Sequence, residues 1–213
     1  MVNKYMNNNK IKSLMEKIEN NFFSQKSYFY SLLPYILISG IIFSLGIIIG
    51  YCLIEIFPSE SEKLISLFKQ TYEPILKMPK FSQILFIFLK NGITSFSIII
   101  TGIFFGIIPI VSLISNGEVL GILFGFNLSK YNLFYLLLGI LPHGIIEIPC
   151  FLITSAIGLK IGRNFIKKIF GKEGNLKEEL NSGLIFFLKI IILFLFLAAV
   201  LEVLVSPELL RIY

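Results

Sequence analysis

Long apolar runs with few charges are the feature that most restricts how this chain can fold. Leu32–Phe57 and Leu184–Val205 are each long enough to cross a bilayer as a helix, which takes about 20 apolar residues. Only 15% of all residues are charged and 55% are hydrophobic, whereas soluble domains carry about 25% charged residues. The sequence therefore predicts an all-α, polytopic membrane helix bundle in contact with lipid.

The charges are distributed unevenly and predict an orientation. The net charge of +6 comes largely from lysines in the polar segments 1–31 and 163–183, which the positive-inside rule assigns to the cytoplasm. An even number of crossings must then separate these two segments. We expect about five membrane segments, a cytoplasmic N-terminus and an external tail at 206–213. Basic membrane loops account for the charge, so no nucleic-acid partner is expected.

This reasoning divides the chain into three parts. Segment 1–31 has apolar residues at helical spacing and predicts an amphipathic helix, either on the cytoplasmic membrane face or packed against cytoplasmic loops. Residues 32–205 form a single transmembrane domain. Within it, the polar, proline-containing segment 58–80 is expected to be external, and 163–183 is expected to be a basic cytoplasmic loop.

The middle of the chain predicts irregular helices. Lys90, Asn91 and Gly92 indicate a kink or the start of a second span, which we place at Ile93–Leu113 with a bend at Pro109.

A tight turn is expected next, with Gly117 at a positive φ, and it contains Asn116, Gly117 and Glu118. The apolar runs 119–126 and 133–141 are too short to span and predict broken or re-entrant helices between 118 and 162.

The motif L-P-H-G-I-I-E-I-P at Leu141–Pro149 carries the strongest candidate site. It holds the single histidine, His143, and Glu147 one helical turn later, on the same face if Pro142 begins the helix with Gly144 in its first turn. Polar groups in such surroundings cost several kcal/mol unless they are matched. Two interpretations remain open: a hydrogen-bond network between helices, or an ion, proton or metal site.

Two more carboxylates could join that site. Glu55 and Glu202 fall near the outer ends of their spans, at the level expected for His143 and Glu147. Two alternatives remain for Glu55 and Glu202. Either they join His143 and Glu147 in one site, for which a divalent metal ion is the only cofactor we consider, or they face external water. The chain has no H-E-x-x-H motif and no convincing nucleophile beside a base, so an enzyme is not expected.

Spaced glycines suggest close helix packing. Gly46 with Gly50, and Gly102 with Gly106, each form a small-x-x-x-small pair that lets another helix approach. From these pairs we expect a homo-oligomer, most simply a homodimer.

Several motifs together resemble one family. They are F-L-K-N-G at Phe88–Gly92, N-G-E-V-L-G at Asn116–Gly121, L-P-H-G-I-I-E-I-P at Leu141–Pro149 and A-I-G-L-K-I-G at Ala156–Gly162. In this pattern the sequence resembles the stage II sporulation protein M family over most of residues 33–205.

The resemblance implies a multi-pass protein of the inner (plasma) membrane. It also implies a non-enzymatic scaffold that holds partners such as cell-wall hydrolases at the membrane, the role of the sporulation member. The broken helices and polar residues expected here favour a different class, a transporter or channel with its ion site around His143 and Glu147. Sequence alone leaves both open.

Overall fold

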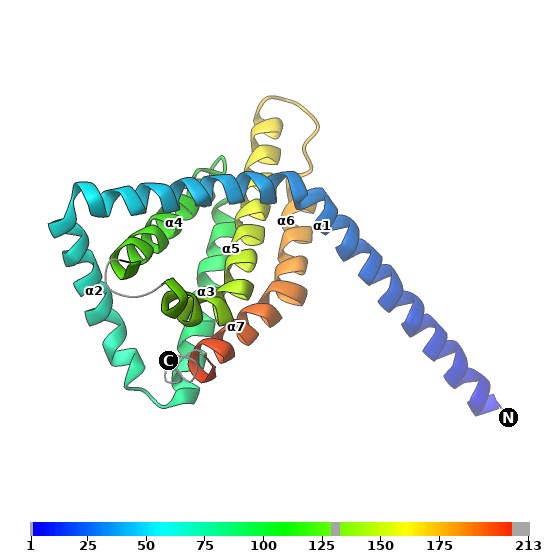
Figure 1. Cartoon of the computed structure of the whole chain (residues 1–213). Helices are drawn as coiled ribbons and strands as arrows, with labels where there is room; N and C mark the ends of the chain where they lie inside the picture. The colour runs from blue at the N-terminus through cyan, green and yellow to red at the C-terminus, as the bar shows by residue number, and fades with distance from the viewer. Residues whose placement is uncertain (1, 129–132, 206–213) are drawn as a thin grey trace. The chain divides into compact units, whose positions relative to one another are not determined.

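The computed structural model describes the backbone of residues 2–128 and 133–205 and the side chains of 24–67, 70–71, 73–126, 128 and 144–205. These residues are almost entirely helical and contain no strand, which confirms the all-α prediction (Figure 1). The elements are α1 (Val2–Ile56), α2 (Pro58–Leu76), α3 (Lys80–Thr101), α4 (Ile107–Leu128), α5 (Leu133–Ile169), α6 (Leu176–Phe186), the π-helix η1 (Phe187–Ile191) and α7 (Ile192–Leu204).

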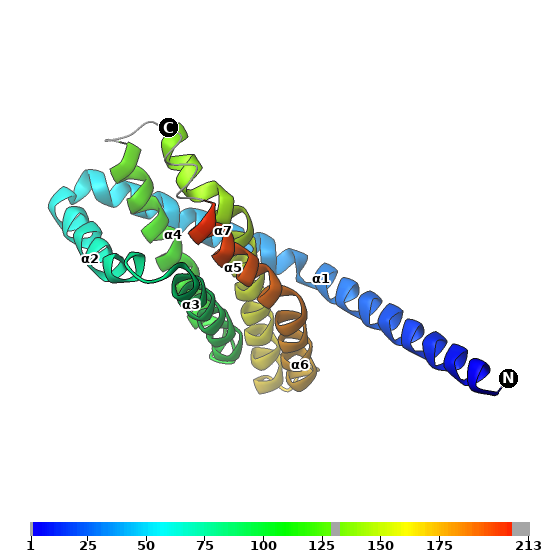
Figure 2. The same cartoon turned by 90° about the horizontal axis from the view of Figure 1, so that it is seen from below.

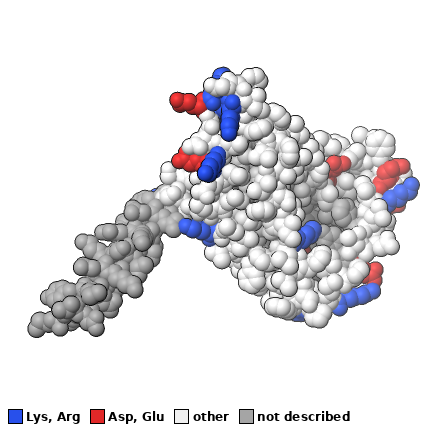
Figure 3. Space-filling view, turned by 180° about the vertical axis from the view of Figure 1, so that it is seen from behind, with Lys and Arg blue, Asp and Glu red and all other residues white. Residues whose placement is uncertain are grey.

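Five of the described helical stretches are long and apolar enough to cross a membrane, which confirms the expected number. They are Ser24–Ile56, Lys80–Thr101, Ile107–Phe126, Gly144–Ile169 and Leu176–Leu204. Their outer surfaces are apolar: Leu37 is 70% exposed, Phe81 76% and Leu193 66%. The face in Figure 3 is mostly uncharged, and most of its charged atoms gather where α5 meets α6 and along α2. A surface of this kind fits lipid rather than water.

The chain divides into two compact units, Met1–Pro34 and Tyr35–Tyr213. In the first unit the described backbone is one continuous helix, the N-terminal part of α1, which continues into the first candidate span without a break. The second unit holds the rest of α1 and every other helix. The description below concerns this second unit.

Helices α3, α5 and α7 lie side by side in both views of the second unit (Figures 1 and 2), and α4 and α6 pack against α5. Their shared core consists of small and branched side chains. Ile99, Ile157, Ala156 and Ala199 are all fully buried there. Small residues such as these allow close helix approach without relying on the hydrophobic effect, which is weak inside a bilayer.

Helix α1 crosses α4 almost backbone to backbone through glycines. A methyl group on Gly46 would lie 2.5 Å from the carbonyl oxygen of Ile114, and one on Gly50 would collide with the carbonyl of Glu118. Gly117 and Gly121 of α4 meet the α1 backbone in the same way. The predicted turn at Asn116, Gly117 and Glu118 is therefore wrong. These residues lie inside α4. Position 117 requires glycine because α1 leaves no room for a side chain, and not because φ is positive.

The predicted second span, Ile93–Leu113, is also wrong, because the chain turns within it. Helix α3 ends at Thr101 and α4 begins at Ile107, with Phe105 at φ 58° and Gly106 at φ 74° between them. Gly102 and Gly106 there contact Gly158 and Gly162 of α5. Pro109 does not bend a span, because it lies in the first turn of α4, where no backbone donor is needed.

Several further boundaries differ from those expected. The run 119–126 belongs to α4 and the run 133–141 to α5, so neither is a separate short helix. Helix α5 continues through Pro142, which therefore does not begin it. Lys90, Asn91 and Gly92 lie in the interior of α3 rather than at a span start. Of the basic segment 163–183, only 170–175 lies between helices.

Candidate functional site

A cavity of about 370 Å³ opens between α1, α3, α4, α5 and α7, inside the second unit. It lies within the stretches that are apolar enough to cross a membrane. Its polar lining is drawn from four helices, so only the folded bundle assembles it. The lining residues are Phe43, Ile87, Lys90, Asn91, Thr94, Ser95, Asn116, Val119, Leu120, Leu123, Gly144, Glu147, Ile148, Phe151, Leu195 and Glu202.

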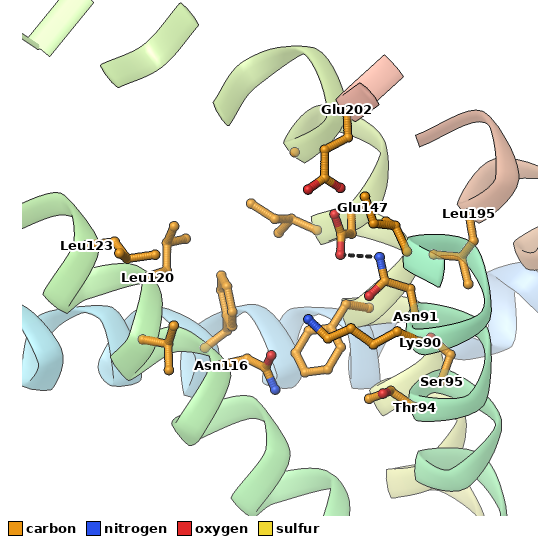
Figure 4. A pocket seen from close by; sticks show the side chains of 16 residues that line it. Lys90, Asn91, Thr94, Ser95, Asn116, Leu120, Leu123, Glu147, Leu195 and Glu202 are labelled. Atoms are coloured by element: carbon orange, nitrogen blue, oxygen red, sulfur yellow. Dashed lines mark hydrogen bonds between the residues drawn. The ribbon is translucent and has the colours of Figure 1, made fainter. Parts of the chain in front are cut away.

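One hydrogen bond ties the polar lining together. The side-chain amide of Asn91 on α3 donates to Oε1 of Glu147 on α5 over 2.6 Å (Figure 4). Both side chains are half-buried. A charge-assisted bond of this kind fixes the carboxylate and stabilises the contact between α3 and α5.

Glu202 of α7 brings a second carboxylate to the same place. Figure 4 shows it directed toward Glu147, and the two carboxylates interact electrostatically. No hydrogen bond from the Glu202 side chain occurs among the described residues. Lys90 extends its ammonium into the cavity and acts electrostatically on both carboxylates. Two carboxyl groups and one amine therefore share one cavity.

The other polar side chains described in the cavity lining are uncharged. Asn116 of α4 is one of them, and its amide also donates to the carbonyl of Ser112 over 2.8 Å. Thr94 and Ser95 line the cavity one turn after Lys90 and Asn91 on α3. Sequence reasoning missed Thr94 and Ser95, although their spacing of four residues places them on the same helix face.

The structure brings together six of the residues singled out from the sequence. They are Lys90, Asn91, Asn116, Gly144, Glu147 and Glu202.

Gly117 and Glu118 are not in the cavity lining, because their backbone packs against α1. Glu55 is exposed near the end of α1 and does not line the cavity either. The side chains of Pro142 and His143 lie outside the described residues. The backbone of α5 places His143 one turn before Glu147.

The cavity is open on one side. Lys90, Thr94 and Asn116 are exposed there, while Asn91, Glu147 and Glu202 are half-buried. Charged groups within membrane-spanning helices are tolerated when they face water or a polar partner. Among the described side chains, no group of three or more histidine, cysteine, aspartate or glutamate residues could hold a metal ion. The arrangement is suited to holding a small charged or polar group.

A second polar cluster lies near the other end of α5. Lys160 forms a 2.9 Å ion pair with Glu179 of α6, and these side chains are only 16% and 11% exposed. Asn164 donates to the same carboxylate over 3.5 Å, and Arg163 donates to the hydroxyl of Tyr35 over 2.7 Å. This cluster joins α5 to α6 and to α1 without lining the cavity. These pairs could not be predicted from local patterns, since their members lie far apart in the chain.

Comparison with known proteins places the chain in a family. The family model for stage II sporulation protein M matches residues 4–207. An uncharacterized protein of Methanocaldococcus jannaschii is 31% identical over 181 residues, covering 81% of this chain and 94% of that protein. No solved structure matches. The match spans every motif on which the resemblance depended, and the chain belongs to the stage II sporulation protein M family.

Proposed function

We propose that this membrane protein transports a solute together with a cation, and that the cavity lined by Lys90, Glu147 and Glu202 is its binding site. The observation that supports this proposal is that these three ionisable side chains line one open cavity within the candidate spans. Ionisable groups at such depth are costly, and in membrane proteins they mark ion and substrate pathways.

Formal charge supports a cation at the carboxylate end. With one lysine and two glutamates, the described part of the lining carries one excess negative charge when all three groups are ionised. Asn91 holds Glu147 in place, whereas Glu202 makes no hydrogen bond among the described residues. A proton or a metal ion beside Glu202 would neutralise the excess, and His143, one turn from Glu147, is the residue that could extend such a site. We propose a binding role without bond-breaking chemistry, so the protein is not an enzyme.

Reconstitution tests this proposal. The purified full-length protein in liposomes is expected to dissipate an imposed proton or sodium gradient when a transported solute is present. Glu202→Gln should abolish that flux, because an amide cannot carry the charge that holds a cation. Glu55→Gln is the matched control, since Glu55 is also a glutamate in a span but does not line the cavity. Equal flux in wild type and Glu202→Gln, or no flux under any gradient, would reject transport.

A scaffold is the second candidate, and family membership favours it. In that role the open cavity would receive a polar side chain from a partner's membrane helix, and the partners would be cell-envelope enzymes of the plasma membrane. Purification from native membranes in mild detergent should then recover a stoichiometric partner that Glu147→Leu or Lys90→Leu releases. Recovery of the chain without such a partner would count against a scaffold.

Homo-oligomerisation also remains a proposal. The glycines that suggested it pack within the chain. Gly46 and Gly50 of α1 pack against α4, and Gly102 and Gly106 pack against α5. A dimer would have to use other surfaces, for example the exposed apolar residues of α7. Native mass spectrometry that shows only monomer in mild detergent would reject it.

A further inference from the structure

We infer that the solute held in this cavity is a small zwitterion, a molecule that carries a primary ammonium, a carboxylate and an apolar body. This inference rests on the proposed function, in that it takes the cavity to be a solute site. It deepens that proposal by naming the chemical class. The observation behind it is the separation of charge along the cavity.

The two ends of the cavity carry opposite chemistry. Glu202 and Glu147 come from α7 and α5 and are drawn together at one end in Figure 4. The ammonium of Lys90 points into the space between those carboxylates and Asn116 of α4. A ligand can therefore meet acceptors at one end and donors at the other. The carboxylates accept from a ligand ammonium, while Lys90 and the Asn116 amide donate to a ligand carboxylate.

A zwitterion satisfies this arrangement better than a simple ion does. An anion bound at Lys90 would also face two carboxylates, and an organic cation at the carboxylates would face the lysine. A molecule with both charges matches each end and leaves the net charge of the site unchanged. The lysine ammonium has three donors, so it can take a ligand carboxylate while it keeps an existing interaction.

The remaining lining, among the residues that the structure describes, is apolar and limits which ligand body can fit. Phe43, Phe151, Leu120, Leu123 and Leu195 surround the polar groups. A volume of about 370 Å³ holds an amino-acid-sized molecule, including one with an aromatic side chain. Apolar walls with a few placed polar groups are the usual composition of small-molecule sites.

Matched triplets of ligands test the inference. The full-length protein in lipid nanodiscs is titrated with glycine, leucine and phenylalanine, each beside its amide and its deaminated acid: glycinamide and acetate, leucinamide and 4-methylpentanoate, phenylalaninamide and 3-phenylpropionate. At least one zwitterion is expected to bind roughly tenfold or more tightly than both of its partners, since each partner lacks one charge-assisted contact. Calorimetry or ligand-induced thermal shift measures the difference.

Two variants assign the ends. Lys90→Gln should abolish the preference for the zwitterion over its amide, and Glu202→Gln should abolish the preference over its acid. Glu55→Gln should leave all affinities unchanged, because Glu55 does not line the cavity. Thermal unfolding without ligand shows that each variant is folded. If a variant is unfolded, Thr94→Val, which removes only a hydroxyl from the lining, replaces it and should weaken zwitterion binding.

The outcomes separate this inference from the function on which it rests. If no zwitterion in the panel binds better than both of its partners, the zwitterion assignment is overturned. Cation flux that still depends on Glu202 would then leave the transport proposal intact. If amides alone bind, the cavity is a site for organic cations. If both ligand binding and flux are absent, both proposals fail together.

Discussion

The side-chain amide nitrogen of Asn91 lies 2.6 Å from Oε1 of Glu147, and the two residues are 56 positions apart in the chain. Their hydrogen bond joins α3 to α5. The contact links an N-G step in one apolar run to the P-H-G-x-x-E motif in another. Two of the family-like motifs thus meet in a single hydrogen bond.

The first prediction concerns the stability of that bond. Glu147→Leu should destabilise the protein by about 1–3 kcal/mol, because it leaves the half-buried Asn91 amide without an acceptor. Glu147→Gln should cost less, since the amide oxygen can still accept. Thermal unfolding in detergent measures both variants.

The double variant Asn91→Leu/Glu147→Leu supplies the control. Removing both partners should recover part of the loss, and the difference gives the coupling between the two side chains. Wild-type stability in Glu147→Leu alone would show that the bond contributes nothing.

The second prediction concerns the crossing of α1 and α4. Gly50→Ala should destabilise the protein by roughly 1–3 kcal/mol, because the added methyl would collide with the backbone of Glu118. Unlike a flexible side chain, that backbone cannot relieve the clash by changing rotamer. Gly40→Ala is the control in the same helix, since nothing lies within 4 Å of the added methyl. The control should be neutral or stabilising, by up to about 1 kcal/mol from helix propensity. Equal unfolding temperatures for the two variants would contradict the crossing.

A third prediction compares two ion pairs that differ in burial. Lys160→Met should cost about 3–5 kcal/mol, because it removes the cation that lies 2.9 Å from the mostly buried carboxylate of Glu179, and the Asn164 amide at 3.5 Å does not replace that charge. Lys77→Met should cost no more than about 1 kcal/mol, because Lys77 and Glu73 are 73% and 64% exposed. Chemical or thermal unfolding in detergent provides the comparison. Adding Glu179→Leu to Lys160→Met should restore much of the loss, and failure of that rescue would show that packing rather than charge explains the cost.

The fourth prediction is orientation. From the basic segments we expect Lys63 and Tyr213 outside and Lys167 inside. Five candidate spans would place the two ends of the chain on opposite sides of the membrane. Single cysteines at these positions, in a background with Cys52 and Cys150 replaced, can be labelled with an impermeant maleimide on intact cells. Labelling at position 167 without permeabilisation would show that the predicted orientation is wrong.

The class of fold and the number of candidate membrane segments could be predicted from the sequence alone. Both follow from composition over windows of about 20 residues, and a bilayer allows few alternatives to a helix at that length. The motif Leu141–Pro149 likewise directed attention to Glu147, since a carboxylate in apolar sequence needs a partner. The identity of that partner, Asn91, did not follow, because helix pairing is not encoded in local spacing.

The residues at which the helices begin and end depend on tertiary packing. Asn116 and Gly117 have the composition of a turn, yet they lie inside α4 because the backbone of α1 passes over Gly117 and leaves no room for a side chain. The real turn at 102–106 is apolar and carries no polar signal, and it is closed by Phe105 and Gly106 at positive φ against α5. Glycine can either allow a positive φ in a turn, as at Gly106, or allow close approach of another helix, as at Gly117. Only the packing of the neighbouring helix shows which of the two applies. The cavity arises from the same packing, which brings Lys90, Glu147 and Glu202 from three separate helices to one place.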